Sequence, residues 1–149
     1  MKNSLPLFTK PGVSRSSNMR AIKSKGNHST EWRLRSMLVR QKIKGWKMHN
    51  QEIIGSPDFV FPTKRIAIFL DGCFWHGCPI CGHIPKTNCE YWKAKLARNI
   101  SRDKINTRQL RKQGFTVIRI WECALKKNPT RYLQRIRDTL ERSRELETY

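Results

Sequence analysis

The sequence has 149 residues, the length of one domain that is large enough to form a single hydrophobic core. It contains 31 Lys and Arg against 11 Asp and Glu, a formal net charge of +20, which indicates a polyanionic partner, nucleic acid ahead of an anionic membrane surface. No apolar run is long enough to span a bilayer, and residues 1–6 lack the apolar segment of a signal peptide, so we expect a soluble cytoplasmic protein.

The first 27 residues are rich in Lys, Arg, Ser, Asn, Pro and Gly and show little periodicity. This composition predicts a basic arm that is partly disordered until it binds DNA, the alternative being a solvated tail. We expect residues 28–149 to form a single folded domain.

Ser29 or Thr30 can cap a helix that runs to about residue 44. Glu31, Leu34 and Leu38 share one face of this helix. A carboxylate in an apolar stripe is unusual because burying an unpaired charge is costly. The structural explanation is that the helix dipole favours an acidic side chain in the first turn.

An extended stretch over residues 46–54 and a turn precede two strands, residues 58–61 and 65–71, which we expect to pair as a hairpin because only residues 62–64 separate them. Counting outward from the turn places Asp58 roughly opposite Leu70, near Asp71. Carboxylate and strand-end carbonyl oxygens together favour a hard divalent cation such as magnesium.

Asn88 can cap a long helix that ends at Gly114. The inner stripe of this helix mixes apolar and polar side chains: Trp92, Leu96, Asn99, Asp103, Asn106 and Leu110. Its polar members indicate a face that lines a site or is partly solvated.

A strand over residues 115–121 follows, and a last amphipathic helix begins at residues 128–129. The order helix, three strands, helix, strand, helix predicts an α/β fold in which helices flank a mixed central sheet.

Three cysteines, Cys73, Cys78 and Cys81, lie within nine residues, and Cys123 directly follows a core strand and could return beside them. Four thiolates fit a tetrahedral structural zinc ion, and His83 could replace one of them. The total of five cysteines in a reducing compartment argues against disulfides. The alternatives are ordinary reduced cysteines or a redox role for the C-x2-C pair.

His76 lies between the first two of these cysteines. A histidine beside a carboxylate can act as a general base near neutral pH, and Asp103 of the long helix is a candidate orienting partner. The alternative is a structural histidine. Phe74, Trp75 and Trp92 are either core packing or, on a DNA-binding face, wedges between base steps.

The segment IFLDGCFWHGCP at residues 68–79 resembles the signature of the very-short-patch mismatch-repair (Vsr) endonucleases. The resemblance continues in the same order along residues 14–140, through NMRAI at 18–22, PDFV at 57–60, PKTN at 85–88, YW at 91–92, Asn99-x3-Asp103 and WECAL at 121–125.

This resemblance implies a restriction-endonuclease-like core of the PD-(D/E)XK type and a DNA endonuclease. Such an enzyme nicks one strand 5′ of the thymine in a T:G mismatch, the lesion left by deaminated 5-methylcytosine. It further implies that the Asp58 side chain and the Leu70 carbonyl hold magnesium, that His76 activates water, that Asp103 holds His76, and that Glu31 orients water in the metal shell.

The resemblance also favours zinc ligation by the cysteine tetrad: Cys73, Cys78, Cys81 and Cys123. Phe74, Trp75 and Trp92 would intercalate beside the mismatch, and the implied DNA contacts are Met19, Arg20, Lys86 and Asn99. The implied partner is duplex DNA with a T:G mismatch, bound by a monomer at the bacterial nucleoid. The family also suggests coupling to mismatch-repair proteins.

Three departures from the family pattern matter. Asp71 stands where the family has a histidine linked to the leaving group, and it could instead add a metal ligand. Cys78 replaces a histidine and Cys81 is displaced by one residue, changes that keep soft ligands. No lysine follows in E-x-K spacing, so a histidine-based mechanism is expected. Two other hypotheses are a zinc-stabilised DNA-binding module without catalysis and a restriction-type nuclease that cuts both strands.

Overall fold

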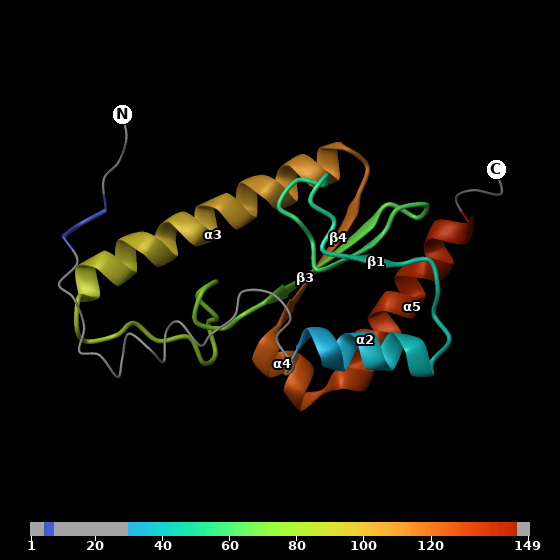
Figure 1. Ribbon diagram of the computed structural model, residues 1–149, viewed down its shortest axis with the longest axis horizontal. Helices are drawn as coiled ribbons and strands as arrows, with labels where there is room; N and C mark the ends of the chain where they lie inside the picture. The colour runs from blue at the N-terminus through green and yellow to red at the C-terminus, as the bar shows by residue number, and fades with distance from the viewer. Residues whose placement is uncertain (1–4, 8–29, 146–149) are drawn as a thin grey trace.

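The computed structural model describes residues 5–7 and 30–145 (Figure 1). In chain order its elements are α2 (Glu31–Arg40), β1 (Lys47–Met48), β2 (Phe59–Phe61), β3 (Ile66–Asp71), α3 (Cys89–Lys112), β4 (Thr116–Trp121), α4 (Glu122–Lys127) and α5 (Pro129–Glu145). Ser29 and nearly all of the predicted basic arm lie outside the described residues. Within the described ranges, no helix combines the length and the apolar character needed to cross a bilayer.

The four strands form one mixed sheet in the order β1-β2-β3-β4. The β1–β2 and β2–β3 pairs are antiparallel, and β3 pairs with β4 in parallel. The long helix α3 is the crossover between the two parallel strands. In Figure 1, α3 lies on one side of the sheet, and α2, α4 and α5 lie on the other. The predicted mixed sheet flanked by helices is therefore confirmed.

Two hydrophobic clusters cover the two faces of the sheet. Ile66 and Ile68 of β3 belong to the larger cluster with α2, α4 and α5, whereas Ala67 and Phe69 pack against Leu110 of α3. Successive strand side chains point to opposite faces, so a strand that is covered on both sides is apolar at nearly every position. This double burial explains the continuous apolar run that predicted β3.

The β2–β3 hairpin is confirmed, but its register differs from the prediction by one residue. Phe59 pairs with Ile68 and Phe61 with Ile66, so one further step places Asp58 opposite Phe69. The reason is that Arg65, predicted as strand, belongs to the turn: its φ is 50° and its N–H bonds the Pro62 carbonyl at 3.2 Å.

Helix ends also differ from the expectations. α2 ends at Arg40, not near residue 44, and Lys42 then adopts a φ of 54°. Thr30 occupies the N-cap of α2 without a side-chain capping bond to any described residue. α3 lies where it was predicted, between Asn88 and Gly114, whose φ is 82°. α4 was not predicted, because its six residues are too few to show a helical period.

Candidate active site

Asp58 lies at the entry to the hairpin, and its carboxylate accepts a hydrogen bond from the Leu70 N–H at 2.7 Å. Burial raises the pKa of Asp58 to about 6; the nearby acids Glu31 and Asp71 add to the shift, and the Leu70 bond and His49 oppose it. The Asp58 side chain thus reaches Leu70 on the neighbouring strand through the Leu70 N–H, and this bond does not involve the Leu70 carbonyl that the resemblance implies as a metal ligand. Burial disfavours the ionised form of this carboxyl group, and a nearby cation would stabilise that form.

A second carboxylate and a histidine stand beside Asp58. Glu31 is only 3% exposed, and its Oε2 lies 3.0 Å from His49 Nε2. Ligand atoms of Glu31, His49 and Asp58 all lie within 4.8 Å of one another. The helix dipole alone therefore does not explain Glu31 in its apolar stripe: the side chain has an imidazole partner, and the group could hold a divalent cation.

Sequence reasoning missed His49. It directly follows β1, and its N–H bonds the Asp58 carbonyl at 3.1 Å because Met48 pairs with Phe59. The histidine sits in a stretch expected to be extended, but nothing local to it indicates which strand it joins. A ladder between β1 and β2 is the signal that would have placed it next to Asp58.

His76 and Asp103 form the predicted imidazole–carboxylate pair, with Nδ1 2.5 Å from Oδ2. Burial would raise the pKa of Asp103, but the His76 bond and the charges of His76 and Arg119 hold that pKa below its ordinary value. Gly77 allows this approach. Its φ is 68°, and a Cβ there would lie 2.8 Å from Ile100 Cδ1 of α3. The glycine lets the histidine-bearing loop lie against α3.

Asp71 forms a buried ion pair with Arg119 of β4. The two bonds measure 2.7 Å from Nε and 2.6 Å from Nη2, and Asp71 is 4% exposed. Asp71 Oδ1 also lies 3.7 Å from His76 Nδ1, and Arg119 Nη2 lies 3.4 Å from Asp103 Oδ1. Arg119 was not singled out from the sequence, although a lone charge inside an apolar strand signals a buried partner.

Asp71 therefore connects two groups of side chains. It faces the His76–Asp103 pair, and its charge contributes to the raised pKa of Asp58. Both of its oxygens are engaged by Arg119. A cleft of about 730 Å³ opens beside Asp71, His76 and Asp103, between α3 and β4. A phosphodiester could reach the imidazole through this cleft.

The four predicted cysteines come together as free thiols, with Cys73, Cys78, Cys81 and Cys123 sulfurs all within 4.8 Å of one another. The sulfur of Cys78 lies 3.7 Å from that of Cys123 and 3.8 Å from that of Cys81. A tetrahedron with Zn–S bonds of about 2.3 Å has S···S edges of about 3.8 Å, so the cluster has the size of a zinc site.

The surroundings of the sulfurs also suit metal binding. Burial would raise the pKa of the Cys78 thiol, but the backbone N–H groups of Cys81 and Ile80 lower it to about 7. Burial raises the pKa of Cys73. Four sulfurs packed together are stabilised by a cation that allows all of them to ionise. His83, the alternative ligand, is exposed outside the cluster, its ring centroid 5.8 Å from that of Phe74.

The three predicted wedge residues form one aromatic cluster at the first half of α3. The Phe74 ring centroid lies 5.0 Å from Trp75 and 5.2 Å from Trp92. Lys95 Nζ sits 5.4 Å from the Trp75 ring and 5.2 Å from that of Trp92. Trp92 itself is 9% exposed, so it supports the other two rings in this conformation.

The remaining predicted DNA contacts are placed in part. Asn99 donates to the Trp75 carbonyl at 3.0 Å and so steadies the aromatic cluster. Lys86 is exposed in the loop before α3. Met19 and Arg20 lie outside the described residues.

The sequence comparisons agree with one another. A family model described as DNA mismatch endonuclease Vsr matches residues 7–81. The type II nicking enzyme V.XorIIP of Xanthomonas oryzae is 37% identical over 109 residues, 72% of this chain and 78% of the relative. The Escherichia coli DNA mismatch endonuclease Vsr is 37% identical over 116 residues, 76% of this chain and 72% of the relative. The type II nicking enzyme V.NaeI of Lentzea aerocolonigenes is 48% identical over 66 residues, 44% of this chain and 40% of the relative.

Proposed function

Because the chain belongs to the Vsr family of DNA mismatch endonucleases, we propose that it nicks one strand of duplex DNA, 5′ of the thymine in a T:G mismatch. One observation carries the proposal. Asp71 lies 3.7 Å from His76 of the His76–Asp103 pair, and its charge also contributes to the raised pKa of Asp58, so the candidate base and the candidate metal ligand both interact with this one side chain. We take the core to be of the PD-(D/E)XK type. The similarity to a type II nicking enzyme supports cutting of one strand.

The Asp58 carboxylate and the Leu70 carbonyl are the groups that would hold magnesium, and ligand atoms of Glu31 and His49 lie within 4.8 Å of the Asp58 carboxylate. Bound there, magnesium would neutralise the phosphate and polarise its oxygen. The raised pKa of Asp58 supports this assignment, because a cation favours the ionised carboxylate.

His76 serves as the general base. Asp103 engages Nδ1 at 2.5 Å, which directs the proton of that nitrogen toward the carboxylate and leaves Nε2 to accept a proton from the attacking water. The resulting imidazolium is stabilised by Asp103 and by Asp71, 3.7 Å from Nδ1. Glu31 would orient water beside the metal.

The aromatic cluster reads the mismatch by opening it. A T:G pair is more easily unstacked than a matched pair, so insertion of Phe74 and Trp75, supported by Trp92, favours the mismatched site. Met19 and Arg20 of the basic arm, together with Lys86 and Asn99, complete the DNA contacts.

A structural zinc ion is the proposed occupant of the cysteine cluster, where it would anchor the His76 loop to the end of β4. The protein works as a monomer at the nucleoid of a bacterial cytoplasm, and its products enter mismatch repair.

The test is a nicking assay with magnesium on three duplexes: matched, hemimethylated and T:G-mismatched, with each strand labelled separately. The proposal expects one nick, 5′ of the mismatched thymine, and little cutting of the other duplexes. Binding without cutting would favour the DNA-binding module. Equal cutting of both strands, or of matched DNA, would favour a restriction-type nuclease.

A further inference from the structure

The second half of α3 carries four exposed cationic side chains on the wall of the cleft: Lys104, Arg108, Arg111 and Lys112. We call them the basic surface of α3. Within residues 30–145 as described, no carboxylate forms an ion pair with any of them. Other helical lysines do have acidic neighbours: Lys93 bonds Glu90 and Lys126 bonds Glu122.

The two acidic groups of the cleft do not neutralise this surface. Asp71 is occupied by Arg119 and Asp103 by His76. The Arg119 guanidinium also stacks on Phe69, with Cζ 4.8 Å from the ring centroid, so these contacts hold Arg119 in place on the β4 side of the cleft. The outer wall of the cleft is therefore positive and free to meet an anion.

The spacing of the four residues matches a nucleic-acid backbone. Arg108 follows Lys104 by four residues, and Arg111 and Lys112 follow Arg108 by three and four, so all four lie on neighbouring positions of one side of the helix. From Lys104 to Lys112 the helix rises about 12 Å at about 1.5 Å per residue. One DNA strand presents a phosphate about every 3.4 Å along the duplex axis, so this length matches about three phosphates.

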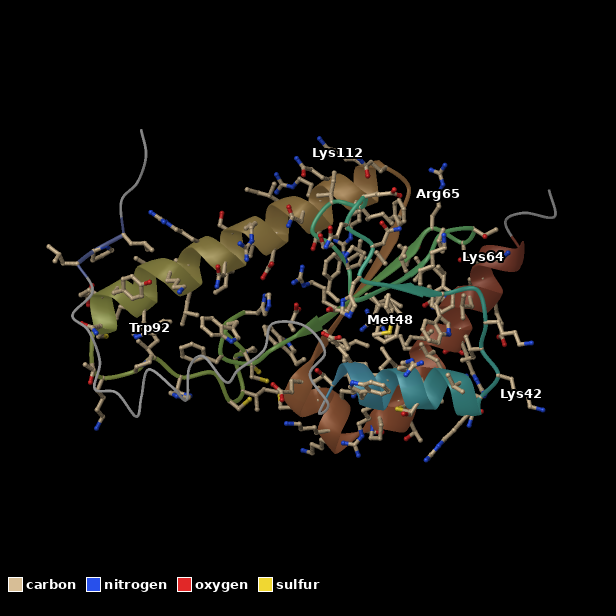
Figure 2. All side chains as sticks on the ribbon, in the orientation of Figure 1. Lys42, Met48, Lys64, Arg65, Trp92 and Lys112 are labelled. Carbon is tan, nitrogen blue, oxygen red and sulfur yellow. The ribbon has the colours of Figure 1, made fainter. Side chains whose placement is uncertain are left out.

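Their location fixes which part of the DNA they would meet. Figure 2 shows Trp92 near the start of α3 and Lys112 near its end, and Asp103 lies between them in sequence. The aromatic cluster is thus at one end of the helix, the His76–Asp103 pair is in the middle, and the basic surface is at the other end. A strand with its scissile phosphate at His76 would run on past Lys104 toward Lys112.

We propose that the basic surface of α3 binds the DNA backbone that flanks the nick, about three phosphates on the side away from the mismatch. The inference rests on the proposed function for the position of the scissile phosphate. It assigns α3 a second task, to hold the flank in line with the cleft, in addition to supplying Asp103.

The test removes the four charges together by Lys104→Gln, Arg108→Gln, Arg111→Gln and Lys112→Gln. A matched control removes four exposed charges across the sheet, on α4 and α5, by Lys127→Gln, Arg131→Gln, Arg135→Gln and Arg142→Gln. Both sets are made in an Asp58→Asn background so that the DNA stays intact. Fluorescence anisotropy measures binding to a T:G duplex from 50 to 300 mM salt. Pairwise variants, 104 with 108 and 111 with 112, cover the case in which four changes unfold the protein.

Each lost phosphate contact reduces the magnitude of the negative slope of log K against log salt by about 0.9, so that magnitude should fall by about three in the α3 variant and by less than one in the control. The pairwise variants should each lose about half of that. A duplex shortened to a few base pairs on the side of the nick, 5′ of the mismatched thymine, should abolish the difference in slope between the α3 variant and its parent. Shortening the other side should leave it unchanged.

Equal slopes for the α3 variant and the control would overturn the inference, and so would a difference that survives both shortened duplexes. Failure of the proposed function looks different, because the protein with Asp58 intact would then make no nick at T:G. The slope measurement needs no cutting and is read independently.

Discussion

Three buried or half-buried ionisable side chains near the site each have a partner on another element. Glu31 of α2 meets His49, Asp71 of β3 meets Arg119 of β4, and the loop residue His76 meets Asp103 of α3. A charge removed from water is tolerated only when it is paired. Replacing one member of such a pair therefore leaves the other member buried without its partner, which destabilises the protein. Asp58 differs, because its carboxylate is held mainly by a backbone N–H.

Replacing Asp58 with Asn should abolish nicking and at the same time stabilise the protein without added magnesium. The folded pKa, about 6, lies above the ordinary 3.8, so the carboxyl favours folding below pH 4 and loses that contribution as pH rises through 6. At pH 8 the variant should be more stable by up to about 3 kcal/mol, and the gain should shrink toward pH 4. Urea unfolding at both pH values measures this. A gain that is the same at both would contradict the raised pKa.

Replacing Asp103 with Asn should slow chemistry without weakening DNA binding. The amide no longer stabilises an imidazolium at His76, and general-base catalysis contributes about 10²–10⁴ in rate. We expect the single-turnover nicking rate to fall by about 100-fold, with the Kd for the T:G duplex unchanged. A Kd that rises in step with the rate loss would instead make Asp103 a structural residue.

At the scale of elements, the segment from residue 72 to residue 88 contains the candidate base, three of the four clustered cysteines and two of the three aromatic wedges, and it has no helix or strand. Its position depends on a few attachments: the cysteine cluster at the end of β4, Gly77 against Ile100, and the His76–Asp103 bond. Both hydrophobic clusters are built from other elements. Zinc should therefore govern the order of this loop and leave the rest of the fold standing.

Cys123→Ser should remove the metal and free the loop. Metal analysis should fall from about one zinc per chain to near none, because three thiolates hold zinc more weakly than four. Protease cleavage within residues 72–88 should rise, while the far-ultraviolet circular dichroism stays close to that of the parent. Cys89→Ser is the matched control, since Cys89 lies outside the cluster and should change neither readout. Zinc retained by the Cys123 variant would exclude the tetrad.

The whole molecule has a net charge of +20, which bears on affinity more than on selectivity. Phosphate contacts carry no information about the bases. Selectivity is expected to come from opening of the mismatched pair, which leaves the number of bound phosphates the same. Charge should therefore act equally on matched and mismatched duplexes.

Raising salt from 50 to 200 mM should weaken binding to both duplexes by about 10³–10⁵ if six to ten phosphates are contacted. The ratio of their affinities should change by less than about threefold, as measured by competition titration. A ratio that collapses with salt would locate selectivity in ionic contacts and not in the aromatic cluster.

Much of the fold follows from local pattern. Apolar runs predicted β3 and β4, the spacing between Asn88 and Gly114 predicted α3, and the cysteine spacing predicted the tetrad, whose sulfurs now lie within 4.8 Å. The His76–Asp103 pair was also predicted, because His76 lies in a loop of candidate site residues and Asp103 lies on the polar part of the inner face of α3. The family resemblance rested on short sequence motifs, which can be recognised without a structure.

The sequence by itself determined which residue types are buried and which elements they form, because hydrophobic periodicity is a property of neighbouring residues. Only the tertiary structure decided that His49 joins Glu31 and Asp58, that Arg119 grips Asp71, and that the hairpin register moves by one residue. The physical reason is distance along the chain. Asp71 and Arg119 are 48 residues apart, and the parallel pairing of β3 with β4, not any local preference, brings them together.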